Sequence, residues 1–128
     1  MSKLLIVDDE EGVRALVSMT LDSGAYEIFE ARDGAQALQM AREHRPDLVL
    51  LDVMLPDMSG VDVCRRLKAD PATAKVTIVM LTARAQSTDL TDAEGAGADG
   101  YFTKPFSPIA LTRKVESILG QTSAWAQS

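Results

Sequence analysis

Four short apolar segments of this chain stop abruptly at polar residues, and this pattern restricts the fold more than any other feature. The segments are residues 4–7, 48–51, 76–81 and 100–103, and they are followed by Asp8, Asp52, Thr82 and Lys104. Continuous apolar segments of this length are typical of parallel strands that are buried on both faces. Because parallel strands end at one edge of a sheet, the polar residues should meet there, where open α/β sheets bind ligands.

Amphipathic segments alternate with the apolar ones, which predicts an α/β fold with a parallel sheet and helices on both faces. We expect helices over about residues 10–23, 33–43, 59–70 and 107–119. Residues 26–31 alternate between apolar and polar side chains, as an edge strand does. A further helix over 87–96 contains few strong helix formers, so it should be the least stable element and the most mobile.

Capping patterns support three of these helices. Asp33 with Gln36 and Ser59 with Asp62 have the spacing of capping boxes. The pair at 107–108, Ser followed by Pro, is a favourable start for the last helix. The face of the first helix that should be buried consists of Val13, Leu16, Val17, Thr20 and Leu21.

The composition is that of one soluble globular domain, which we expect to cover residues 1–120, followed by a flexible tail or linker over 121–128. The net charge of −6 argues against direct nucleic-acid binding by this domain. Cys64 is the only cysteine, so we expect it to be buried on a helix in a protein of a reducing compartment. No membrane span or signal peptide is recognisable, which predicts a cytoplasmic protein without membrane contact.

Three carboxylates, of Asp8, Asp9 and Asp52, should converge at the predicted sheet edge. At separations of about 4–6 Å they would repel one another by a few kcal/mol per pair. Lys104 offsets only one of the three charges, and the chain has no Cys/His cluster. An all-oxygen site with few ligands favours Mg²⁺ over zinc. A simpler interpretation also stands for each residue alone: the acids can favour a helix start, Thr82 can be a cap and Lys104 an ordinary surface lysine.

A metal beside a carboxylate, a lysine and a hydroxyl is a set of groups suited to phosphoryl transfer. The carboxylate can attack phosphorus and become an acyl phosphate, while the cations and the hydroxyl stabilise the oxygens of the transferring group. The chain contains no glycine-rich loop with P-loop spacing, so it does not bind a nucleoside triphosphate in that way.

Five motifs in matching order and spacing make the chain resemble the receiver domains of two-component response regulators, over nearly all of residues 2–120. They are IVDDE at 6–10, LLDVMLP at 50–56, DMSG at 57–60, LTA at 81–83 and YFTKPF at 101–106. The fold that this resemblance implies is a flavodoxin-like, doubly wound sheet of five parallel strands in the order 2-1-3-4-5.

The resemblance implies that Asp52 is phosphorylated by a sensor histidine kinase or a histidine phosphotransfer protein. It implies that Asp9, Asp52 and the backbone carbonyl of Met54 bind Mg²⁺ directly, and that Asp8 acts through a coordinated water. Thr82 and Lys104 would hold the phosphoryl oxygens.

A switch is implied as well, in which the aromatic Tyr101 turns inward as Thr82 moves toward the phosphate. The fourth helix, fifth strand and fifth helix would then signal to a downstream effector whose identity stays open. Met54 and Arg84 match positions that tune the lifetime of the phosphate. Because neither is a carboxylate or amide able to position water, we expect slow self-dephosphorylation, and no catalysis beyond the chain's own phosphorylation and dephosphorylation.

Other interpretations remain open. A phosphatase with an aspartyl nucleophile would need a second Asp where Met54 stands, and a flavin-binding electron carrier would be disfavoured by the acids at 8–10. A degenerate receiver that only binds a partner is disfavoured by the intact acidic residues. The chain can be a complete protein or a receiver domain excised from a transcription factor or signalling enzyme, and either a monomer or a phosphorylation-dependent homodimer.

Overall fold

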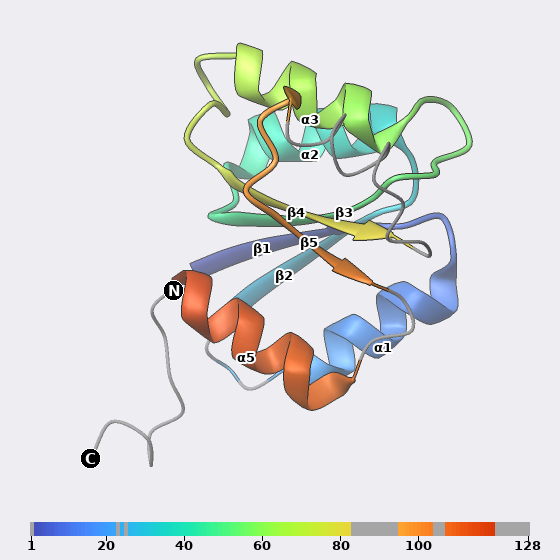
Figure 1. The fold of residues 1–128 in the computed structure, drawn as a ribbon, viewed down its shortest axis with the longest axis vertical. Coiled ribbons are helices and arrows are strands. Elements are labelled where there is room, and N and C mark those ends of the chain that lie inside the picture. Colours follow the sequence, from blue (N-terminus) through green and yellow to red (C-terminus); the bar gives the residue numbers. More distant parts are fainter. Residues whose placement is uncertain (1, 23, 25, 83–94, 104–106, 120–128) are drawn as a thin grey trace.

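The structure is a computed structural model that describes residues 2–22, 24, 26–82, 95–103 and 107–119 (Figure 1). Within these residues the elements follow in the order β1 (Ser2–Val7), α1 (Glu11–Leu21), β2 (Tyr26–Ala31), α2 (Gly34–His44), β3 (Leu48–Asp52), α3 (Gly60–Ala69), β4 (Thr77–Thr82), β5 (Gly100–Thr103) and α5 (Pro108–Leu119). The predicted helix over 87–96 falls almost wholly outside the described residues, as does the predicted tail over 121–128.

The strands form one parallel sheet in the order β2-β1-β3-β4-β5. Helices α2 and α3 cover one face of the sheet, and α1 and α5 cover the other (Figure 1). The predicted doubly wound fold and strand order are therefore confirmed, and β2 is an edge strand as its alternating sequence indicated. Within the described part of the chain, no helix has both the length and the apolar character that a membrane span requires.

The core lies in two layers, one on each face of the sheet, and the inner strands β1, β3 and β4 take part in both. All five residues of β3 and the last four of β1 are buried. Alternate side chains of these strands point to opposite faces, so Leu5 and Val49 belong to the layer under α2 and α3, whereas Leu4 and Leu48 belong to the layer under α1 and α5. Burial on both faces explains why these segments are continuously apolar.

The predicted buried face of α1 is wrong in one position. Val17 and Leu21 are buried and Val13 packs against them, but Leu16 is 46% exposed. The helix contacts the sheet and α5 along a narrower stripe than its apolar residues suggested, so Leu16 and its neighbour Met19 face outward. The helix also ends at Leu21, two residues earlier than predicted.

The predicted caps at Asp33 and Ser59 are present, but the second hydrogen bond, which would complete a capping box, differs. The Asp33 carboxylate accepts a hydrogen bond from the Gln36 N–H at 2.8 Å. The Gln36 side chain does not close the box on Asp33; its carbonyl oxygen accepts from the Arg32 N–H at 2.9 Å. At α3, Ser59 accepts from Val61.

Cys64 lies on α3 with its side chain fully buried, as predicted, and its Sγ is 3.6 Å from the Ala96 carbonyl oxygen. Desolvation raises the pKa of the Cys64 thiol to about 11. Since the thiolate is the reactive form, we expect native protein near pH 8 to react with a disulfide reagent roughly 100-fold more slowly than unfolded protein. Thiol titration with and without guanidinium chloride measures the two rates; similar rates would contradict the burial.

Candidate functional site

Two buried carboxylates lie on neighbouring strands at the carboxyl edge of the sheet. Asp8 directly follows β1 and is 0% exposed, and Asp52 is the last residue of β3 and is 7% exposed. The register pairs Val7 with Leu51, so Asp8 and Asp52 occupy the next level of the two adjacent strands. The chain thus brings two acids together where the sequence pattern predicted that strands would end side by side.

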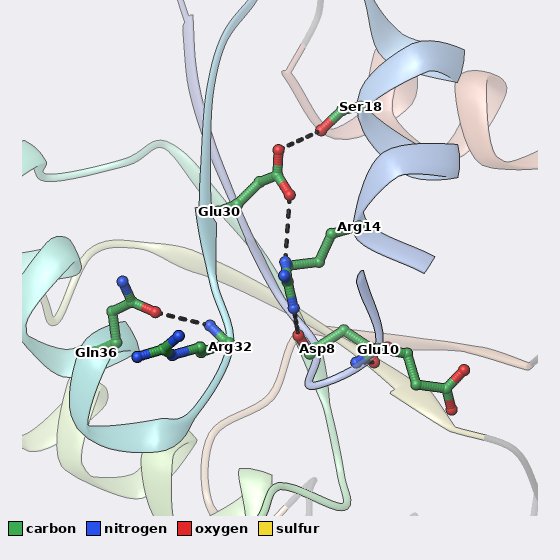
Figure 2. Close-up of polar contacts among 7 residues, drawn as sticks. All are labelled: Asp8, Glu10, Arg14, Ser18, Glu30, Arg32 and Gln36. Carbon is green, nitrogen blue, oxygen red and sulfur yellow. Dashed lines mark hydrogen bonds and ion pairs between the residues drawn. The ribbon is translucent and has the colours of Figure 1, made fainter. Parts of the chain in front are cut away.

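The turn between β1 and α1 adds two further carboxylates. The side-chain oxygens of Asp8, Asp9 and Glu10 lie within 4.8 Å of one another, with Asp9 and Glu10 exposed. The Asp8 Oδ1 accepts a hydrogen bond from the Glu10 N–H at 2.9 Å, which folds the turn back on itself (Figure 2). No ligand role was predicted for Glu10, because only the folded turn brings its carboxylate beside those of Asp8 and Asp9.

Arg14 fixes this turn from α1, a role that was not predicted from the sequence. Figure 2 shows its guanidinium between Asp8 and Glu30: Nη1 donates to the Asp8 backbone carbonyl at 2.7 Å, and Nε donates to the Glu30 carboxylate at 3.2 Å. Ser18 donates to the other oxygen of Glu30 at 3.3 Å. Because Glu30 is on β2, Arg14 ties the acidic turn to the neighbouring edge strand.

The segment after β3 leaves the sheet and returns at once. The Met54 N–H lies 3.4 Å from the Asp52 Oδ1, and the Gly60 N–H donates to the Val53 carbonyl at 2.7 Å. A Cβ at position 60 would collide with the Asp52 carbonyl oxygen, so glycine is required for this close approach. The Met54 side chain is 79% exposed, while its backbone N–H lies against the Asp52 carboxylate.

The structure describes only some of the remaining predicted site residues. Thr82 ends β4 opposite Thr103, and its side chain is not described. Arg84 and Lys104 lie outside the described residues. Tyr101 is on β5 opposite Met80 and is 49% exposed. Its inward turn on phosphorylation stays a prediction.

The donor set at this edge fits Mg²⁺. In the described part of the chain, the carboxylates of Asp8, Asp9 and Glu10 converge, with no imidazole or thiolate among them. Asp52 adds a fourth carboxylate at the end of the adjacent strand β3. Hard oxygen donors with exposed members that leave room for water suit Mg²⁺, which keeps part of its hydration shell in proteins. Clustered carboxylates also repel one another, so a divalent cation relieves an unfavourable interaction that the fold itself creates.

Comparison with known proteins leads to one family. Residues 4–116 match the response regulator receiver domain. The phosphate regulon transcriptional regulatory protein PhoB of Pseudomonas aeruginosa is 41% identical over 93% of this chain and 52% of its own length. The alkaline phosphatase synthesis transcriptional regulatory protein PhoP of Bacillus subtilis is 40% identical over 98% and 52%. The chain therefore spans about half the length of these curated relatives. Among solved structures, the chemotaxis response regulator CheY4 of Vibrio cholerae superposes with a TM-score of 0.86 at 32% identity, covering 92% of this chain and 98% of that one.

The acidic turn predicts a specific response to Mg²⁺. In Asp9→Asn, one exposed carboxylate of the cluster loses its charge, so stability without metal should be unchanged or higher by up to about 1 kcal/mol. We expect MgCl₂ to stabilise the unmodified protein and not Asp9→Asn, because ligands stabilise only a fold that binds them. Thermal unfolding with and without MgCl₂ measures both effects. Asp22→Asn, at the other end of α1, is the control; an undiminished Mg²⁺ effect in Asp9→Asn would contradict the site.

Proposed function

This chain belongs to the response regulator receiver domains of two-component signalling, and from that membership we propose that it accepts a phosphoryl group on Asp52 from a histidine kinase or a histidine phosphotransfer protein. One observation carries the proposal: a buried carboxylate ends the central strand β3, level with the buried Asp8 of β1. Burying two carboxylates on adjacent strands is costly, and phosphoryl transfer is a reaction that needs them there.

The chemistry follows from the position of Asp52. A carboxylate oxygen attacks phosphorus, the bond between phosphorus and the donor imidazole nitrogen breaks, and an acyl phosphate forms on Asp52 while the leaving nitrogen takes up a proton. The fixed strand end and the Met54 N–H at 3.4 Å restrict the rotation of the Asp52 side chain, which favours in-line attack.

The acidic residues serve the same reaction by holding Mg²⁺. We assign direct coordination to Asp9, Asp52 and the Met54 carbonyl, and contact through a water molecule to Asp8; Glu10 adds negative charge at the same turn. When bound, Mg²⁺ neutralises charge on the site and on the incoming phosphoryl group. Thr82 and Lys104 then hold phosphoryl oxygens. The strand order supports this assignment, because β4 pairs with β3 and β5 pairs with β4.

The output is a change in a surface with three parts: β5, α5 and the segment that follows β4. Phosphorylation adds nearly two negative charges and strong acceptor oxygens. These draw Thr82 and Lys104 toward Asp52, and Tyr101, half exposed on β5, moves into the space that Thr82 leaves. The changed surface binds a downstream effector or a second copy of the chain in the cytoplasm.

Direct nucleic-acid binding is not part of this proposal. The net charge of −6 opposes contact with phosphate backbones. The matched curated relatives are named transcriptional regulators and are about twice as long as the matched region. We therefore attribute any transcriptional output to a partner or to a further domain, and assign only the switch to these residues.

Mass spectrometry after treatment with a small-molecule acyl phosphate and Mg²⁺ tests the proposal. We expect one added phosphoryl group, mapped to Asp52, and none without Mg²⁺. Asp52→Asn should remove the modification because the amide is a much weaker nucleophile. Asp62→Asn, an exposed acid on α3 that pairs with Arg65, is the matched control and should be modified normally. Many turnovers of a generic phosphate ester would favour the phosphatase alternative instead.

The lifetime of the phosphorylated form is a second test. Neither Met54 nor Arg84 has a carboxylate or amide oxygen that could accept a hydrogen bond from an attacking water, so decay in Mg²⁺ should take minutes or longer. Met54→Asn places an amide at this exposed position and should shorten the lifetime. Loss of label from the unmodified protein within seconds would contradict the expectation, as would an unchanged lifetime in Met54→Asn.

A further inference from the structure

The segment between β3 and α3 is fastened to the start of α2 by one side chain. The two carboxylate oxygens of Asp57 accept hydrogen bonds from the Gly34 and Ala35 N–H groups, at 2.8 and 2.9 Å. Met58 lies against the same helix end, where a Cβ at position 34 would collide with its side chain. Residues 57 and 58 therefore sit directly on the first turn of α2, more than twenty residues away in sequence.

The base of the same segment is closed by backbone contacts. Gly60 donates to Val53, and Met54 forms an isolated bridge with Ser59. The segment is thus held at its base on β3 and at its tip on α2. Met54 is part of the base attachment, and its backbone N–H faces the Asp52 carboxylate.

Asp57 is a second cap of α2, supplied by a distant part of the chain. Asp33, the residue before the helix, already caps it through the Gln36 N–H. Asp57 satisfies the next two free N–H groups from a distant part of the chain. The two backbone N–H groups lower the pKa of the Asp57 carboxyl, because they stabilise its charged form. A charged acceptor makes both bonds stronger than neutral ones.

We propose that Asp57 is a positioning residue for the metal site: by anchoring residues 53–59 to the first turn of α2, it fixes the Met54 backbone beside Asp52 and so increases the affinity for Mg²⁺. This inference rests on the proposed function, in which the Met54 carbonyl is a ligand. Without the anchor, ordering the segment costs conformational entropy each time Mg²⁺ binds. Residues that orient metal ligands typically change affinity by 10-fold or more when lost.

Two alanine variants separate positioning from helix capping. Asp57→Ala and Asp33→Ala each remove one acidic cap from α2, but only the first releases the segment that carries Met54. Isothermal titration with MgCl₂ should show about 10-fold weaker binding for Asp57→Ala and an unchanged affinity for Asp33→Ala. Asp57→Asn keeps an acceptor oxygen and should fall between Asp57→Ala and the unmodified protein.

Amide hydrogen exchange supplies a readout that does not depend on the metal. In Asp57→Ala, exchange in residues 53–59 should accelerate relative to the unmodified protein and to Asp33→Ala. Unaltered Mg²⁺ affinity in Asp57→Ala, or an equal loss in Asp33→Ala, would overturn the positioning role. Absence of Mg²⁺ binding by the unmodified protein would instead overturn the proposed function, and the positioning role with it.

Discussion

The parallel pairing of β1 with β3 is the constraint on which the site depends. It sets Val7 opposite Leu51 and so places Asp8 and Asp52 at the same level of adjacent strands. A slip by one residue would turn the buried side chains of β1 to the other face of the sheet, which the two apolar layers do not permit. Packing of the core therefore offsets the repulsion between the two carboxylates. If either apolar layer of the core were lost, the register of β1 on β3 and the geometry of the site would be lost with it.

Two tethers hold the loops at the ends of these strands, and each uses a charged side chain on backbone groups. Arg14 binds the Asp8 carbonyl from α1 and is itself held by Glu30 of β2. Asp57 binds two N–H groups of α2 from the segment that follows β3. Without such tethers the acidic turn and the Met54 segment could move apart and relieve the repulsion. Because they resist that movement, the site keeps a geometry in which a bound cation would relieve the repulsion.

The features that could be predicted from the sequence are those determined by residues close to one another in the chain. The strands, their buried or edge character, the cap at Asp33 and the burial of Cys64 all follow from local patterns. Leu16 was misassigned because the width of a buried stripe depends on how closely α1 packs on the sheet, which no local pattern reports. Arg14 and Asp57 were missed for a related reason: their partners lie at least six residues away, and an exposed Arg or Asp is unremarkable until the fold supplies the partner.

Two of the four acids are buried and two are exposed, and this difference affects how such a site can act as a switch. Asp8 and Asp52 are buried and cannot be screened by water, whereas Asp9 and Glu10 are exposed and keep the site open to ions. A phosphoryl group on Asp52 would add charge at the buried side, where it is least screened and where compensation must come from donors on neighbouring strands. A modification shifts a conformational equilibrium only by the difference in its interaction energy between the two states. A new charge at the buried carboxylates would make that difference larger than a charge at the exposed ones, and it would direct the response toward β4 and β5, which lie on the side of β3 away from β1.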